Sequence, residues 1–438
     1  MTDFSTLRQI LQIRYIAMFF RYGVKTIMNS NKLKLRVAAI IAAYLVGCAA
    51  VVSRFDGPFQ KMYTHLYVAA LLLVGVFALA AGIWLVGAPK GYIGIMQNIY
   101  RVGLTNAASE APVLIARCTS KDKPSTEVWE FETYGVPYSV WLDYAEKLES
   151  ALDIAFVKAD PGRNGRTVLL TVIPHPGPWP EKLLWDNRLL SSNQSVLVLG
   201  ENRSEQVTLD LSSIPHLLTA GRTGSGKSVL QKSLMLQALL QGMEVILVDY
   251  KLGVDYSREW PKYCEIITDD DTLLKRLTEI QREMLDRYTL LTESGYANID
   301  EYNAAGGSMK RVCIFIDEIA ECLDRSNAAD KAQKEIIAAI SWSISSLCRL
   351  GRAAGCHVFL ATQRGSADVL SGQIRSNVFK VLGSCDDNLS ILTLGTAEAA
   401  RKLPTDARGR FIDERGNMFQ GYYSDYNSGV FSPLEGRP

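Results

Sequence analysis

The chain has 438 residues, a length that suggests about three domains. Its formal net charge is only +1, which excludes a strongly basic protein with a general affinity for polyanions. Any contact with nucleic acid must therefore come from local patches. The eight cysteines have no C-x-x-C spacing and the four histidines no paired spacing, which argues against a disulfide framework or a zinc site and is typical of reduced thiols.

The first 36 residues are basic and partly apolar. Apolar side chains are interleaved with polar ones from Phe4 to Ile16, and Asp3 is the single acid. The seven cations of this segment are Arg8, Arg14, Arg21, Lys25, Lys32, Lys34 and Arg36. We predict an amphipathic helix at the surface of an anionic lipid bilayer, with a solvated basic leader as the alternative.

Two uncharged apolar runs follow, at residues 37–53 and 66–88. The second is long enough to cross a bilayer as a helix, and the first is at the short end of the required range. We therefore predict a two-helix transmembrane hairpin over residues 37–89. Positive charge is heaviest before the first run, so the N-terminus and everything after Pro89 should lie in the cytoplasm. A secretory signal is disfavoured by the long leader, and buried core helices by the length of the second run.

A small α+β domain is predicted over residues 95–180. One amphipathic helix should cover residues 139–152, and four prolines within 174–180 predict a rigid linker. The apolar face of that helix would carry Val140, Leu142, Ala145, Leu148 and Leu152. The predicted strands are 113–116, 128–131, 154–157 and 168–172.

Apolar runs alternate with helical patterns over the last predicted domain, residues 190–430. The predicted strands are 217–220, 245–249, 312–316 and 357–360, and the predicted helices are 228–240, 272–291 and 334–350. Such alternation is typical of a parallel sheet covered by helices on both faces. The fold class is therefore α/β: a RecA-like P-loop motor with a mostly parallel sheet, preceded by the small α+β domain and the N-terminal hairpin.

The central motif of the motor is a phosphate loop, Gly221-Arg222-Thr223-Gly224-Ser225-Gly226-Lys227-Ser228, which fits G-x-x-x-x-G-K-[ST] at every fixed position. Glycine lets the backbone wrap a phosphate, and the loop amides and the next helix N-terminus carry positive partial charge. We expect Lys227 to bind the β- and γ-phosphates of ATP and Ser228 to bind Mg²⁺. Arg222 should point outward. The alternative is a glycine-rich turn that binds nothing, which the flanking strand and helix disfavour.

Polar side chains follow two of the predicted strands. Asp317 and Glu318 come directly after 312–316, where the first acid is expected in the Mg²⁺ shell and the second as the base that activates water. The alternative is an acid pair that only complements a helix dipole. Gln363 follows 357–360 and should point into the nucleotide crevice to sense the γ-phosphate, with an ordinary loop amide as the alternative.

Further motifs surround these residues. They are Pro215-His216-Leu217-Leu218-Thr219-Ala220, Val248-Asp249-Tyr250-Lys251, Glu283-Met284-Leu285-Asp286-Arg287-Tyr288 with Tyr302-Asn303, Gly351-Arg352-Ala353-Ala354-Gly355-Cys356-His357, and Leu360-Ala361-Thr362-Gln363-Arg364. With them the chain resembles the FtsK/SpoIIIE class of membrane-anchored DNA translocases over roughly residues 125–415. Tyr250 and Gly365 stand where that family has proline. Two apolar runs replace the usual four, and no winged-helix segment precedes Pro438, a layout similar to the TcpA-type coupling proteins of conjugative elements in Gram-positive bacteria.

The resemblance implies a multi-pass protein of the bacterial cell membrane with a cytoplasmic motor. It implies a homo-hexamer that hydrolyses ATP and threads double-stranded DNA, with a relaxase and transfer-channel proteins as further partners. In such rings an arginine completes the neighbour's site, and Arg352 is the first candidate, Arg349 the second, with a surface salt bridge as the alternative role for each. Non-specific DNA contacts are expected from a loop over residues 364–380, through Arg364, Arg375 and Lys380. A protein-secretion ATPase of the same superfamily and a chromosome-segregation DNA pump are the alternative functions.

Overall fold

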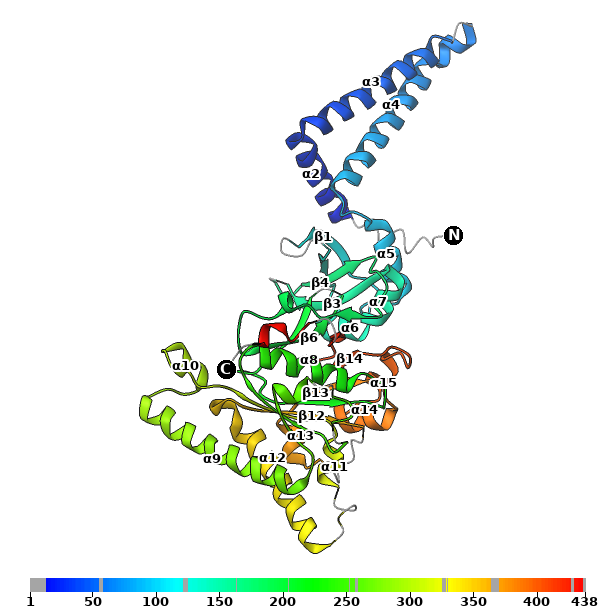
Figure 1. Cartoon of the computed structure of the whole chain (residues 1–438). Coiled ribbons are helices and arrows are strands. Elements are labelled where there is room, and N and C mark those ends of the chain that lie inside the picture. Colours follow the sequence, from blue (N-terminus) through cyan, green and yellow to red (C-terminus); the bar gives the residue numbers. More distant parts are fainter. Residues whose placement is uncertain are drawn as a thin grey trace. The chain divides into compact units, whose positions relative to one another are not determined.

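The structure is a computed structural model that describes residues 13–54, 58–120, 125–162, 164–203, 205–251, 253–256, 259–324, 328, 330–363, 370–426 and 429–435. The chain divides into two compact units, Met1–Gly177 and Pro178–Pro438, and each is taken by itself. The elements of both units are labelled in Figure 1.

The described part of the first unit begins at residue 13 with three long helices, α2 (Ile13–Asn29), α3 (Asn31–Val52) and α4 (Pro58–Gly87). Ser30 separates the first two, and its Oγ accepts a hydrogen bond from the Leu33 N–H at 3.4 Å, which caps α3. This cap explains why the helix starts before the predicted residue 37. α3 and residues Tyr63–Gly87 are long and apolar enough to cross a membrane, and neither stretch is buried within the structure.

α2 divides its apolar side chains between two faces. Phe19 is fully buried, and its ring lies 5.1 Å from that of Tyr92 in an edge-on contact. Ile16 and Phe20 remain exposed. Only the exposed side of α2 is therefore available to a bilayer, and residues 1–12 of the predicted amphipathic helix lie outside the described residues.

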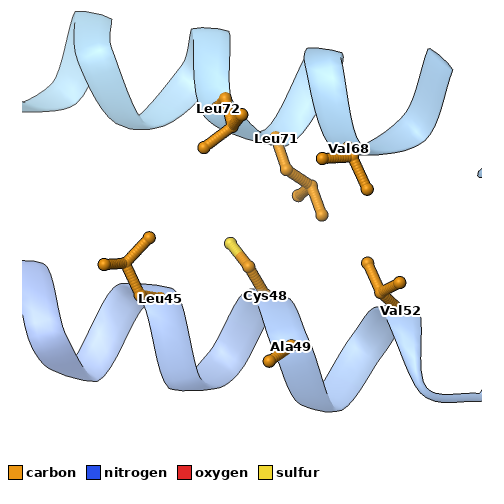
Figure 2. Close-up of a pocket in the computed structure, with 7 residues that line it drawn as sticks. All are labelled: Leu45, Cys48, Ala49, Val52, Val68, Leu71 and Leu72. Atoms are coloured by element: carbon orange, nitrogen blue, oxygen red, sulfur yellow. The ribbon is translucent and has the colours of Figure 1, made fainter. Parts of the chain in front are cut away.

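An apolar cavity of about 270 Å³ lies between α3 and α4. Figure 2 shows the side chains that line it, most of them directed at the facing helix: Leu45, Cys48, Ala49, Val52, Val68, Leu71 and Leu72. None of them carries a charge. The cavity thus reflects imperfect packing of two hydrophobic helices and offers no charged group to a ligand.

The rest of the first unit is a small α+β fold. Its sheet has the order β1-β2-β4-β3 and is antiparallel throughout. The elements are α5 (Tyr92–Arg101), β1 (Val113–Thr119), β2 (Glu127–Glu132), α6 (Tyr138–Asp143), α7 (Ala145–Leu152), β3 (Ile154–Pro161) and β4 (Thr167–Pro174). All four predicted strands are present.

The predicted single helix over residues 139–152 is wrong, because the structure has two helices there. Tyr144 separates α6 from α7 with φ −92° and ψ 0°, which interrupts regular helix geometry. Trp141 is fully buried against Phe131, with ring centroids 5.1 Å apart, whereas Leu142 is 46 % exposed. The large indole ring takes the core position that the sequence pattern assigned to Leu142.

The second unit contains the phosphate loop and, within its described residues, an eleven-stranded sheet. Its strands are β5 (Leu183–Leu184), β6 (Val196–Glu201), β7 (Gln206–Asp210), β8 (Leu217–Ala220), β9 (Glu244–Val248), β10 (Glu265–Ile267), β11 (Val312–Ile316), β12 (Cys356–Thr362), β13 (Phe379–Gly383), β14 (Arg410–Asp413) and β15 (Met418–Tyr423). Its α-helices are α8 (Lys227–Leu240), α9 (Asp270–Ser294), α10 (Ile299–Ala304), α11 (Ile319–Leu323), α12 (Lys331–Ala354), α13 (Gly372–Ser376), α14 (Asp387–Leu394) and α15 (Glu398–Lys402), with short 3₁₀ turns η1 (Asn187–Leu189), η2 (Trp260–Lys262) and η4 (Ser432–Leu434).

The sheet has a parallel part and an antiparallel part. Its order is β10-β9-β11-β12-β8-β13-β14-β15-β6-β7, with β5 beside β15. Neighbours from β10 to β13 are parallel, and those from β13 to β7 are antiparallel. The predicted P-loop motor fold with a parallel sheet is confirmed, and the antiparallel extension was not predicted.

Helices cover both faces of the parallel strands, as Figure 1 shows for α8 on one side and α9 and α12 on the other. Alternate side chains of β11 enter the two layers. Phe315 packs in the core that contains Leu234 of α8, while Ile314 packs in the core that contains Ile344 of α12. This alternation follows from the two-residue period of a strand.

The carboxyl ends of four parallel strands lie at one edge of the sheet. The register pairs Ile316 with both Val248 and Leu360, and Thr362 with Ala220. The segments that follow these strands therefore start side by side. In open α/β sheets this edge is where ligands bind.

Candidate active site

The phosphate loop connects β8 to α8 and is held from the antiparallel side of the sheet. The Gly409 N–H donates to the Ser225 carbonyl at 2.9 Å, and the Arg222 N–H donates to the Ser384 carbonyl at 2.9 Å. Gly226 has φ +105°, and a Cβ there would lie 2.9 Å from Gly409. Only glycine fits this position. Sequence reasoning missed Ser384 and Gly409, because nothing local marks a residue that contacts the loop from a distant part of the chain.

Lys227 is the first residue of α8 and is only 6 % exposed. Its Nζ donates to the carbonyls of Gly221 at 2.8 Å and Arg222 at 3.0 Å. Burial lowers the pKa of this ammonium, while the carboxylates of Glu318 and Asp317 oppose that shift. A partly desolvated cation inside a loop of backbone amides at a helix N-terminus is suited to bind phosphate.

The structure also shows where Arg222 points. Its side chain is exposed to solvent, and a guanidinium N–H donates to the Thr405 carbonyl. This agrees with the prediction that Arg222 points outward. The hydrogen bond adds a second tie between the loop and the segment that precedes β14.

Glu318 lies at the carboxyl edge and is tied to the end of β12. Its Oε1 accepts a hydrogen bond from the Thr362 hydroxyl at 2.9 Å, and its Oε2 accepts one from the Gln363 N–H at 3.1 Å. Burial raises the pKa of this carboxyl above its ordinary value, although these hydrogen bonds and Lys227 act in the opposite direction. The carboxylate is therefore held in a fixed place and has an increased affinity for a proton.

Gln363 joins this carboxylate to the phosphate loop. Its Oε1 accepts a hydrogen bond from the Thr223 hydroxyl at 2.5 Å, while its backbone N–H is bound by Glu318. The structure thus brings together the loop, Glu318 and Gln363 from β8, β11 and β12.

Asp317 is buried beside the same edge, with 5 % exposure. The Lys251 Nζ lies 3.6 Å from its Oδ2, and the Tyr256 hydroxyl lies 3.5 Å from its Oδ1. Both contacts are longer than a strong hydrogen bond. A buried carboxylate with such loose contacts is a hard oxygen donor of the kind that Mg²⁺ prefers, and the Ser228 hydroxyl in the first turn of α8 is a donor of the same kind.

The segment after β9 explains one departure from the family pattern. Tyr250 stands where the family has proline, and its hydroxyl donates to Asp270 Oδ1 at 2.6 Å, at the start of α9. Burial raises the pKa of this phenol, so it stays protonated and keeps donating. The tyrosine therefore provides a hydrogen bond that proline could not make.

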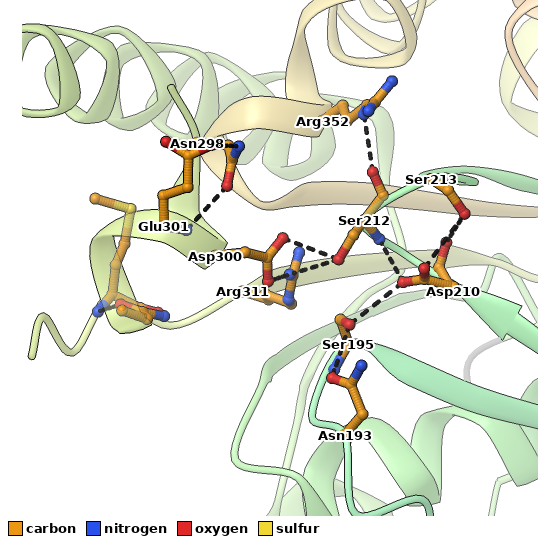
Figure 3. Close-up of polar contacts among 12 residues, drawn as sticks. Asn193, Ser195, Asp210, Ser212, Ser213, Asn298, Asp300, Glu301, Arg311 and Arg352 are labelled. Atoms are coloured by element: carbon orange, nitrogen blue, oxygen red, sulfur yellow. Dashed lines mark hydrogen bonds and ion pairs between the residues drawn. The ribbon is translucent and has the colours of Figure 1, made fainter. Parts of the chain in front are cut away.

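Arg352 lies at the opposite edge of the sheet, just before β12. Its Nε donates to the Ser212 carbonyl at 2.9 Å, and Figure 3 shows that Ser212 also contacts Asp300, which pairs with Arg311. The seven residues of β12 separate this edge from the carboxyl edge by about 23 Å at about 3.3 Å a residue. Arg352 thus cannot reach the phosphate loop of its own chain, and neither can exposed Arg349, three residues earlier on α12.

The predicted DNA-binding loop over residues 364–380 requires a correction. Residues 372–376 form α13, which contains Arg375, and Lys380 lies within β13. The Lys380 ammonium is 3.2 Å from Glu414 and is half-buried, so it is engaged inside its own chain. The hydrophobic pattern of β13 already ran through this lysine, which the prediction overlooked. Arg364 lies outside the described residues.

Comparison with known proteins supports the family resemblance. The sequence profile of the FtsK/SpoIIIE family matches residues 185–341. The DNA translocase SpoIIIE of Bacillus subtilis is 28 % identical over 302 residues, which cover 62 % of this chain and 37 % of SpoIIIE. The DNA translocase FtsK of Chlorobaculum tepidum is 31 % identical over 270 residues, which cover 56 % of this chain and 32 % of that protein. This chain thus spans only about a third of the length of these relatives, 37 % and 32 %.

A solved structure agrees over most of the chain. The pCW3 conjugation coupling protein TcpA, in its monomer form with ATPγS, is 30 % identical and matches with a TM-score of 0.58. The match covers 79 % of this chain and 99 % of that one. The motifs, the P-loop fold and these similarities lead to one conclusion: the chain belongs to the FtsK/SpoIIIE family.

Proposed function

We propose that this chain is a membrane-anchored ATPase that translocates DNA and serves as a coupling protein in conjugative transfer. The observation that carries the ATPase part is the meeting of Lys227, Asp317 and Glu318 at one edge of the sheet. The translocase part rests on family membership. The conjugative part rests on the similarity to TcpA over nearly the whole of that chain.

The residues of the site divide the work of ATP hydrolysis. The loop amides, the N-terminus of α8 and Lys227 bind the phosphates and offset their charge. Ser228 and Asp317 hold Mg²⁺, which supplies further positive charge to the phosphate oxygens when bound. Glu318 accepts the proton of the attacking water, because its raised pKa increases its affinity for that proton. Gln363 links Glu318 to the phosphate loop, so loss of the γ-phosphate is transmitted through Gln363 to the segment that begins at residue 364.

The remaining parts of the proposal concern assembly and position. Asn31–Val52 and Tyr63–Gly87 anchor the chain in the bacterial membrane, with the motor in the cytoplasm because cations precede the first span. A homo-hexamer presents Arg352, which cannot act in its own chain, to a neighbouring site. Arg364 and Arg375 contact DNA phosphates without reading sequence. A relaxase and transfer-channel proteins are the further partners of the motor.

The decisive experiment measures phosphate release by the full-length protein in detergent, with and without linear duplex DNA. We expect DNA to raise the rate, and Lys227→Ala to abolish turnover under both conditions because the phosphates lose their buried counter-charge. Absence of turnover with any polymer would overturn the ATPase assignment. Stimulation by a secreted polypeptide but not by DNA would replace it with a protein-secretion ATPase.

A second experiment separates a coupling protein from a chromosome-segregation pump. Cells that produce only the Lys227→Ala protein should lose conjugative DNA transfer and still segregate their chromosomes normally. Defective segregation with normal transfer would point to the other role.

A further inference from the structure

The chain after β9 folds back over Asp317 by means of a side-chain turn. Asp249 is 2 % exposed, and its two carboxylate oxygens accept the N–H groups of Lys251 at 3.0 Å and Gly253 at 2.9 Å. Aspartate favours this local turn. The turn fixes the backbone of Lys251 so that its side chain extends toward Asp317, which follows the neighbouring strand β11.

The Lys251 ammonium lies between two carboxylates. Its Nζ is 3.6 Å from Asp317 Oδ2 and 3.5 Å from Asp255 Oδ2. The side chains of Lys251 and Asp255 are 51 % and 48 % exposed, whereas the side chain of Asp317 is only 4 % exposed. The ammonium therefore has one buried partner and one partner at the surface, and its exposed side leaves it room to move from the first to the second.

The electrostatics agree with a charged lysine at this place. Burial alone would lower the pKa of Lys251, but the carboxylates of Asp317 and Asp255 outweigh it and raise that pKa. Lys251 in turn helps to lower the pKa of Lys227, so the two ammonium groups already repel each other. A divalent cation brought to Asp317 would place a third positive centre in the same small region.

We propose that Lys251 is a built-in counter-ion of Asp317, which Mg²⁺ displaces toward Asp255 when it binds with the nucleotide. The inference rests on the proposed function, because it takes Asp317 as a Mg²⁺ ligand. Before displacement, the ammonium offsets the cost of a buried carboxylate. On displacement, Mg²⁺ prevails because it gathers several oxygen ligands, including Ser228 and the phosphates, whereas the half-exposed ion pair is weak. Lys251 is thus a positioning residue that sets the Mg²⁺ requirement of the site.

The test titrates Mg²⁺ into the full-length protein with a fluorescent, slowly hydrolysed ATP analogue and follows binding instead of turnover. Lys251→Met removes the competing cation, so half-saturation should occur at about two- to five-fold lower Mg²⁺, the range of a weak exposed ion pair. The arginine of Lys251→Arg can bind Asp317 with two N–H groups, so this variant should need a higher Mg²⁺ concentration for half-saturation. The matched control is Lys262→Met, a lysine 60 % exposed and paired with Glu259, which should leave the midpoint unchanged.

The same titration separates failure of this inference from failure of the proposed function. If the wild-type protein binds the analogue without any Mg²⁺ dependence, Asp317 is not a metal ligand and the proposed function loses its metal site. If Mg²⁺ dependence is present but Lys251→Met leaves the midpoint unchanged or raises it, the counter-ion role is wrong. The effect of Lys251→Met should also vanish in an Asp317→Asn background, because no carboxylate remains to compete for.

A stability measurement gives a second, independent readout. In EDTA, Lys251→Met leaves the buried Asp317 without its ion pair to Lys251, so the thermal unfolding temperature of the variant should fall below that of wild type and of Lys262→Met. Magnesium chloride alone should restore most of the loss. An unchanged unfolding temperature in EDTA would contradict the proposal.

Discussion

Both edges of the motor's parallel strands hold buried charges, but Arg311 at the amino edge has shorter contacts than Asp317 has at the carboxyl edge. At the amino edge, Arg311 is 7 % exposed and donates to His357 Nε2 at 2.9 Å and to the Asp300 carboxylate. His357 is fully buried and in turn contacts the Pro215 carbonyl at 3.0 Å. At the carboxyl edge, Asp317 is equally buried, yet its side-chain contacts to Lys251 and Tyr256 are at 3.6 and 3.5 Å.

Burial of a charge therefore does not by itself mark a functional site. The amino-edge network is satisfied within one chain. Burial, with the nearby Arg311 cation, holds the pKa of His357 well below its ordinary value, so the ring stays neutral and can accept from Arg311. Such a network stabilises the fold. A buried charge that is loosely held, as Asp317 is at the carboxyl edge, is ready to exchange partners with a ligand.

Arg352 gives the strongest test of the difference between the two edges, because it lies at the amino edge but is proposed to act in a neighbour's active site. If it acts in trans, Arg352→Ala should lower ATP turnover by ~10³–10⁵ while ATP binding stays normal. Phosphate release and analogue binding measure the two quantities. Arg349→Ala is the matched variant on the same helix and should have a much smaller effect.

A mixing experiment decides between action in trans and a structural role for Arg352. Rings that combine Arg352→Ala and Lys227→Ala subunits should regain some activity, because some interfaces join an intact Lys227 to an intact Arg352. No recovery in rings shown to be mixed would leave only the hydrogen bond to Ser212, which is a structural role.

Glu318 gives the next largest effect. Glu318→Gln should retain ATP binding and lower turnover by ~10²–10⁴, because an amide cannot accept the proton of water. The amide oxygen can still accept from Thr362, so the local geometry should persist. Turnover like that of wild type would remove the assignment of Glu318 as the base.

Arg311 should show the opposite pattern, a loss of stability without a loss of function. Arg311→Met leaves His357 Nε2 buried without its donor, which should cost about 1–3 kcal/mol of unfolding free energy. Affinity for the ATP analogue should not change. Arg188→Met is the control, since that side chain is 90 % exposed. Weaker nucleotide binding with unchanged stability would break the distinction between the two edges.

The smallest expected effect is the pH dependence of stability at Glu318. Its pKa is raised by burial, so the stability that comes from its protonation is present below the ordinary glutamate value and is lost as the pH rises through the raised one. Glu318→Gln should therefore unfold at a higher temperature than wild type near pH 8, and the gap should close as the pH falls. A gap that does not vary with pH would contradict the raised pKa.

The local parts of this protein could be predicted from its sequence alone. The phosphate loop, the acids after an apolar strand and the two apolar helices are all encoded in short contiguous stretches, where periodicity and spacing are enough. The parallel strands and their helices followed from alternation. Because parallel strands end at the same edge, even the meeting of Lys227, Glu318 and Gln363 could be predicted.

Contacts between groups from distant segments could not be predicted, and they appear first in the folded structure. The approach of Lys251 to Asp317, the bond from Arg352 to Ser212 and the pairing of Lys380 with Glu414 join residues between 34 and 140 positions apart. Likewise, β15 pairs with β6 across more than half of the unit, which adds the antiparallel strands that no local pattern predicted. Such contacts depend on how whole elements pack. The residues next to a side chain in the sequence do not reveal which residues lie beside it across a sheet.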